Sequence, residues 1–271
     1  MSNYPTDYFK FSASSLGVSA LFTQLDGQAG LNHVIPTLAP AVLGPTGGRA
    51  TGSEKDYAYI VQQPRARTLL SVRTAETVTH GRTGDNQYET EVEADIQELA
   101  VVDKLNIAHL HLHFLSTYDP KNKRSKVSTK GSSIEGVQLG KVTAQVIVDE
   151  EPLLFTGNGD QLVEFYNKQS DDYRKKNGGR FKLAEGAVKC CCEHKFSIVR
   201  EIILSGPESE KQKISVDGYT IHWKGFGKIV LGEVHVKCNE RRLALVRLAM
   251  GCDAGGSGTA GGGASNGGMS N

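Results

Sequence analysis

The chain has 271 residues, with 31 lysines and arginines against 30 aspartates and glutamates, and a formal net charge of +1. This balance argues against a dedicated nucleic-acid-binding protein, because such proteins usually carry an excess of basic residues. Apolar residues make up 38% of the sequence, which is typical of a folded domain rather than a disordered chain. No apolar run approaches the ~20 residues that a membrane-spanning helix needs.

The N-terminus lacks the basic-then-apolar pattern of a signal peptide. There are five cysteines, three of them adjacent: Cys190, Cys191, Cys192, Cys238 and Cys252. An odd number in this arrangement does not fit a framework of disulfide bonds. These features predict reduced thiols and a cytoplasmic location, with export by a route that needs no leader as the alternative.

Apolar and polar residues alternate along most of the chain, which predicts β-strands. The alternation begins at Phe9, Phe11 and Ala13. Residues 25–56 are rich in Gly, Pro, Ser and Thr, and this composition predicts a long irregular arm. Further strand segments are expected at residues 57–62, 68–79, 88–99, 107–117, 134–148, 196–204, 213–222, 228–237 and 243–250.

One segment breaks the two-residue period. Residues 160–176 place Leu162, Phe165 and Tyr166 at helical spacing, and Gly178-Gly179 follows as a stop signal. This pattern predicts an α-helix over 160–176, which would bury its apolar stripe against an open end or edge of the sheets.

About ten strand segments with no alternation of strands and helices predict a mainly β fold. We expect an antiparallel two-sheet sandwich or a jelly-roll-like arrangement, formed by a single β-rich domain over residues 1–250. Residues 251–271 contain nine glycines. Such a composition predicts a flexible Gly/Ser/Asn-rich tail outside that domain.

Three histidines, His109, His111 and His113, would share one face of a strand. Alternate residues lie ~6.8 Å apart along a strand and metal–nitrogen bonds are ~2.0–2.1 Å, so three such histidines do not easily share one ion. Two of them together with a carboxylate from a neighbouring strand would. We therefore consider a divalent metal, zinc or iron, as a cofactor at this position.

The carboxylates for such a site would come from one face of the segment 88–99, which carries Glu89, Glu91, Glu93 and Asp95. The candidate metal ligands are therefore His109, His111, His113, Glu91 and Glu93. The alternative is a solvated strand face, on which the histidines pair with the carboxylates across the sheet. Similarly, Arg241, Arg242 and Arg247 are expected to pair with Glu233 or Glu240 across the C-terminal strands.

A second candidate zinc cluster is Cys190, Cys192 and His194, which would share one face of an extended chain. The alternative is that these small cysteines pack in the core, where cysteine is among the most buried residue types.

The metalloprotease motif H-E-x-x-H and the calcium-binding loop of EF-hand proteins do not occur in the sequence. The sequence therefore favours a non-enzymatic binding or self-assembling structural protein, because this function requires no catalytic motif. Its partner would be a second copy or another protein, reached by the arm 25–56 and the glycine-rich tail. The alternative is a metal-dependent enzyme, with the strand-borne histidines as its site.

Overall fold

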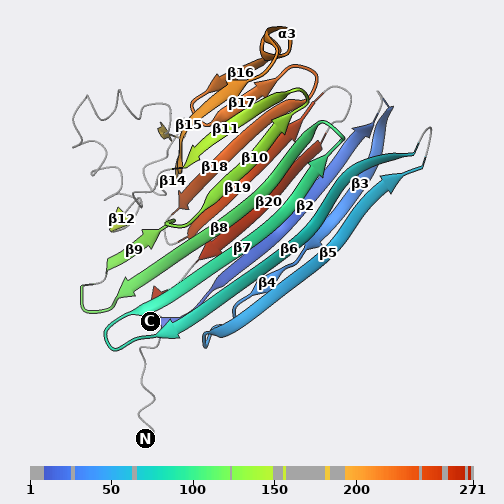
Figure 1. Cartoon of the computed structure of the whole chain (residues 1–271). Coiled ribbons are helices and arrows are strands. Elements are labelled where there is room, and N and C mark those ends of the chain that lie inside the picture. Colours follow the sequence, from blue (N-terminus) through green and yellow to red (C-terminus); the bar gives the residue numbers. More distant parts are fainter. Residues whose placement is uncertain are drawn as a thin grey trace, which may run out of the picture.

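The computed structural model describes residues 9–25, 28–62, 66–122, 124–148, 155–156, 181–183, 193–237, 240–251, 256–265 and 268–269. These residues are almost entirely strand, arranged as two large antiparallel sheets that pack face to face (Figure 1). The predicted mainly β two-sheet fold is therefore confirmed. The predicted helix at 160–176 and the cysteines at 190–192 lie outside the described residues.

The first sheet has nine strands, all paired antiparallel to their neighbours. In order across the sheet, the main path is β15 (Val199–Ser205), β11 (Val142–Val148), β10 (Ser133–Leu139), β8 (Leu105–Asp119), β7 (Tyr88–Val101), β6 (Arg67–Thr83) and β5 (Gly48–Val61). Off this path, the short strand β9 (Arg124–Ser128) pairs with β8, and β12 (Phe155–Thr156) pairs with β9.

The second sheet has ten strands. Its main path is β13 (Phe181–Leu183), β14 (Glu193–Ser197), β18 (Gly227–Lys237), β19 (Glu240–Met250), β20 (Gly256–Ser265), β2 (Ala13–Leu25) and β3 (Gln28–Leu38). Beside this path, β17 (Thr220–Trp223) pairs with β18 and with β16 (Ile214–Asp217), and β4 (Ala41–Val42) pairs with β2.

Three small elements complete the described structure. The strands β1 (Phe9–Lys10) and β21 (Gly268–Met269) pair with each other, and α3 (Glu208–Lys211) is a single helical turn. In the part of the chain that the structure describes, no helix is long and apolar enough to cross a membrane.

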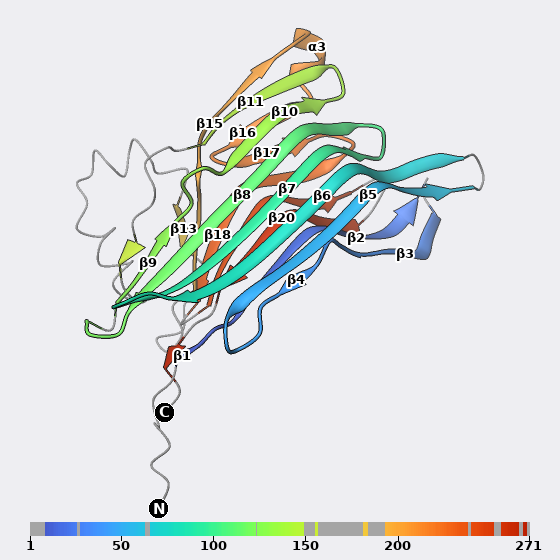
Figure 2. The ribbon, with the colours of Figure 1, turned by 60° about the horizontal axis from the view of Figure 1, so that its bottom comes forward.

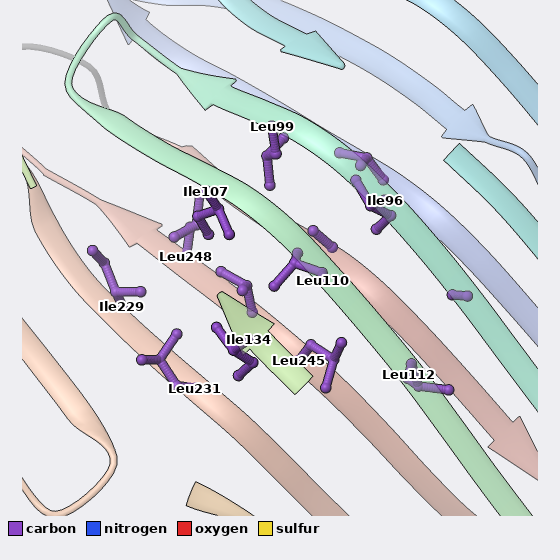
Figure 3. Close-up of a cluster of buried hydrophobic side chains, with 14 of the residues drawn as sticks. Ile96, Leu99, Ile107, Leu110, Leu112, Ile134, Ile229, Leu231, Leu245 and Leu248 are labelled. Atoms are coloured by element: carbon purple, nitrogen blue, oxygen red, sulfur yellow. The ribbon is translucent and has the colours of Figure 1, made fainter. Parts of the chain in front are cut away.

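The core fills the space between the two sheets. Strand β7 packs against β20 and β2 of the other sheet, and both views show the sheets layered in this way (Figures 1 and 2). Figure 3 shows the apolar side chains between the layers, such as Leu110 and Leu112 of β8 with Leu245 of β19. Each of these three is fully buried and contributes about 1.5–3 kcal/mol through the removal of its apolar surface from water.

The prediction of an irregular arm over residues 25–56 is wrong, because most of its described residues form β3, β4 and the first part of β5. Strands β3 and β5 lie at the edges of the two sheets, where many side chains face solvent, so their composition is that of a loop. Small residues in this segment permit close packing. At Gly52, for example, there is no room for a side chain, because a Cβ atom would lie 2.5 Å from the carbonyl oxygen of Pro40.

The prediction of a flexible tail is also wrong for residues 256–265. These form β20, which lies inside the ten-stranded sheet and pairs with β19 on one side and β2 on the other. A Cβ atom on Gly263 would lie 2.6 Å from Cγ1 of Val92 in the opposite sheet. Glycine at this position therefore allows the two sheets to approach each other closely.

A line of irregular residues crosses the nine-stranded sheet and changes which side chains face outward. Glu98 of β7 has φ +53° and Gly136 of β10 has φ +64°, and both flank the segment of β8 around Ala108. As a result, Ile107 and Leu110 are both buried, with two outward-facing residues between them. Strict alternation with His109 would place Ala108 on the buried face beside Leu110, but Ala108 is exposed.

Candidate functional site

Strands β7 and β8 position a row of carboxylates and imidazoles on the outer surface of the nine-stranded sheet. Their inward residues, such as Val92 and Leu112, are fully buried, so the alternate residues face outward. Glu93 lies directly opposite His113 in the register, Asp95 opposite His111, and Gln97 opposite His109. We call the surface formed by Glu91, Glu93, Asp95, His109, His111 and His113 the histidine–carboxylate face.

At one end of this face, His113 is held between a carboxylate and a backbone carbonyl. Its Nε2 atom lies 2.9 Å from Oε1 of Glu91, and its Nδ1 atom lies 2.6 Å from the carbonyl oxygen of Lys130. Glu93 joins the group, because one ligand atom each from Glu91, Glu93 and His113 all lie within 4.8 Å of one another. The three side chains are half-buried.

Several effects act on the protonation of His113. Burial by itself would lower the pKa of this imidazole. The hydrogen bonds to Glu91 and to the Lys130 carbonyl, with the negative charges of Glu91 and Glu93, outweigh burial, so the pKa of His113 lies above its ordinary value. In the absence of another cation, the arrangement therefore favours the imidazolium, which donates from both ring nitrogens.

Further along the face, His109 and His111 both contact one carboxylate. Oδ2 of Asp95 lies 2.7 Å from Nε2 of His109 and 3.3 Å from Nδ1 of His111. Burial would raise the pKa of Asp95, but the hydrogen bond and charge of His109, with hydrogen bonds from Gln97 and His111, hold it below its ordinary value. These residues therefore form a cross-strand pairing network of the kind expected on a solvated strand face.

The five sequence-predicted metal ligands thus fall into two groups. Glu91, Glu93 and His113 come together, whereas His109 and His111 turn to Asp95. One imidazole and two carboxylates fit zinc or ferrous iron, both of which accept nitrogen and oxygen ligands. The Lys130 carbonyl was not anticipated, because a backbone acceptor leaves no signal in the residue types of a sequence.

A groove lies on the outer surface of the other sheet, on the side away from the core. It has a volume of about 920 Å³, and its floor is formed by β2 and the glycine-rich β20, including Ser14, Gly262 and Ala264. One wall carries Glu233, His235, Arg242 and Arg247, from β18 and β19, and the opposite wall carries Thr37, Pro40 and Val42. We call this feature the outer groove.

Charged side chains of the outer groove interact across β18 and β19. Arg247 donates to Glu233, which confirms the expected pairing of these two residues. Tyr219, which directly precedes β17, is 2% exposed. Burial and the charge of Glu233 raise the pKa of Tyr219 to about 12, against an opposing effect of Arg247. The sequence does not predict the groove, because its floor forms where β20 has glycine and alanine in place of larger side chains.

A sequence profile described as a domain of unknown function (DUF8256) matches residues 9–189, which is more than half of the chain. The matched residues include β7 and β8 with the histidine–carboxylate face, whereas β18, β19 and β20 follow the matched segment. No curated protein and no solved structure matches the chain.

Proposed function

The chain belongs to the DUF8256 family, and we propose that it is a non-enzymatic binding protein that recognises an extended polypeptide segment of another protein. The observation that carries this proposal is the outer groove over β20. It lies on the open face of a sheet rather than between the sheets, so a chain segment can enter along its whole length.

The floor of the outer groove suits close approach by a backbone. The outward residues of β20 at this point include Gly262 and Ala264, which project little or nothing above the sheet. Hydroxyl groups of Ser12, Ser14 and Thr259 line the same surface and can exchange hydrogen bonds with peptide groups. A partner backbone can therefore lie directly on the floor.

The two walls favour different side chains. Among the described residues that line this wall there are two arginines, Arg242 and Arg247, and one carboxylate, Glu233, so the lining is positively charged on balance. The opposite wall presents Pro40 and Val42, and Val42 is 69% exposed. Successive side chains of an extended segment point to opposite sides. A segment that alternates acidic and apolar residues would therefore place carboxylates against the arginines and apolar groups against the other wall.

Residues 25–56 and 251–271 are not available as free arms for assembly, because their described parts lie mostly in strands. A different observation bears on self-association: the exposed large apolar side chains among the described residues all lie on strands at sheet edges. These are Val34, Val42, Ile60, Ile203 and Val216. Exposed apolar groups at sheet edges can also pair with a second copy, so sedimentation should accompany the peptide-binding measurement as a test of self-association.

Fluorescence anisotropy with labelled synthetic peptides tests the proposal directly. We expect a short peptide of alternating glutamate and valine to bind the full chain at least tenfold more tightly than its lysine–valine counterpart. Added salt should weaken the binding, because part of the attraction is between exposed charges. The substitution Ala264→Phe, which fills the floor, should abolish binding.

The matched control is Ala58→Phe, which adds the same ring to an exposed position on edge strand β5 of the other sheet. This variant should bind as the wild type does. Equal affinity for both peptides, no binding of either, or unchanged binding by Ala264→Phe would contradict the proposal. Sedimentation in which Ala264→Phe removes self-association would instead identify a second copy as the occupant.

A further inference from the structure

We propose that Glu91, Glu93 and His113 form a binding site for a divalent transition-metal ion, with Zn²⁺ as the preferred ion. The site lies on the outer surface of the nine-stranded sheet, on different strands from the outer groove, so it does not depend on the proposed function. The site contains three of the five metal ligands that the sequence predicts, because His109 and His111 contact Asp95 instead.

The strand register brings the three ligands together. Glu93 and His113 are directly opposite each other on β7 and β8, and Glu91 is the next outward residue along β7. Their ligand atoms already lie within 4.8 Å of one another. Bonds to zinc of ~2.0–2.2 Å allow two ligand atoms at most ~4.4 Å apart. Small rotations of the glutamate side chains, with no movement of the backbone, would therefore complete the coordination.

The turn between β9 and β10 fixes the imidazole of His113, which is the second observation that points to an ion. The Lys130 carbonyl lies 2.6 Å from Nδ1, so Nδ1–H donates to it and Nε2 faces the carboxylates. The Ser132 hydroxyl contacts both the amide and the carbonyl of His113 at 3.0 Å, which holds its backbone. A backbone carbonyl in this position is one of the partners that orient metal-binding histidines.

The chemistry of the ligands selects the ion. Two carboxylates and a neutral imidazole carry two negative charges, which a divalent cation neutralises. The imidazole nitrogen favours zinc and similar ions over Mg²⁺ and Ca²⁺, which prefer oxygen ligands alone. Three protein ligands leave a coordination position for water, and the side chains of Glu91 and His113, 25% and 23% exposed, leave solvent access to it.

Isothermal titration of the full chain with Zn²⁺ tests the site, using protein made without a histidine tag and stripped with a chelator. We expect one ion per chain, retained in the presence of excess Mg²⁺. The substitutions His113→Gln and Glu93→Gln should each weaken Zn²⁺ binding at least tenfold. With Co²⁺ as the probe, the visible absorption bands of the bound ion should change in His113→Gln.

The matched control is His109→Gln, which removes an imidazole from the same face of the same strand but leaves the three ligands intact. This variant should bind Zn²⁺ as the wild type does. Circular dichroism of each metal-free variant checks folding, and Glu93→Gln carries the test if His113→Gln does not fold. Absence of saturable Zn²⁺ binding, or equal weakening by His109→Gln and His113→Gln, would overturn the proposal.

Discussion

The Nδ1 atom of His33 lies 3.0 Å from the hydroxyl of Tyr59, and this hydrogen bond joins the edge strands of the two sheets. His33 belongs to β3 of the ten-stranded sheet and Tyr59 to β5 of the nine-stranded sheet. The Thr77 hydroxyl of β6 makes a second connection, because it donates to the carbonyl oxygen of Ala39 at 2.6 Å. This side of the sandwich is therefore closed by polar contacts as well as by apolar packing.

The first prediction concerns this contact. The substitution Tyr59→Phe removes the hydroxyl and leaves the ring in place, so we expect the free energy of unfolding to fall by about 0.5–1.5 kcal/mol. Chemical denaturation measures this change. Tyr57→Phe, on the same face of β5, serves as the control and should have a smaller effect. A larger loss in Tyr57→Phe than in Tyr59→Phe would contradict the assignment.

The second prediction concerns the close approach of the sheets at Gly263. The added methyl group of Gly263→Ala would meet Cγ1 of Val92 at 2.6 Å, which is too short for the contact to form without displacement. We expect this substitution to reduce the free energy of unfolding by about 1–3 kcal/mol through overpacking. Denaturation with urea provides the measurement.

Gly258→Ala is the matched control for this prediction, because it adds the same methyl group to the same strand. A Cβ atom there would lie 3.4 Å or more from its nearest neighbours, in ordinary contact. Its stability should remain close to that of the wild type. If both alanine variants proved equally stable, the sheets would not be as closely packed at Gly263 as described.

The third prediction concerns alkaline pH. The pKa of Tyr219 is raised from 10.0 to about 12, first by burial and then by Glu233, so folding favours the neutral phenol. The stabilisation from this group is complete below pH 10 and is lost as the pH rises from about 10 through about 12. Wild-type protein should therefore lose more stability across this range than Tyr219→Phe does.

Titration of phenolate absorbance provides an independent measurement. The phenol of Tyr219 should titrate late in the folded wild type, at a pH of about 12, and this late phase should be missing from Tyr219→Phe. Identical titration curves for the two proteins would show that Tyr219 does not occupy the buried environment described.

The strands that alternate clearly were predictable from the sequence. In β7, Val92, Ala94 and Ile96 are fully buried while Glu91 and Glu93 are not, as the two-residue period requires. The first part of the edge strand β5, up to residue 56, and the inner strand β20 were not predictable in this way. The first has many solvent-facing side chains, and the second consists mainly of residues with almost no side chain to show a period.

The candidate site was predictable only in part, for a related reason. Alternation places His109, His111 and His113 on one face, but it does not say which carboxylate each imidazole meets. That depends on the register between β7 and β8 and on the irregularity around Glu98 and Ala108. The role of Lys130 depends on the turn that brings its carbonyl to His113, which a strand pattern does not reveal.

The pairing of β2 with β20 has a consequence for how the chain acquires its structure. Ala13 pairs with Ser265, so the middle of the ten-stranded sheet joins segments from near the two ends of the sequence. Contacts of such high sequence separation form slowly, because a long loop must close before they stabilise anything. On the ribosome, the N-terminal strand must therefore wait for its neighbour to be synthesised, with its hydrogen-bonding edge open to other partners in the meantime.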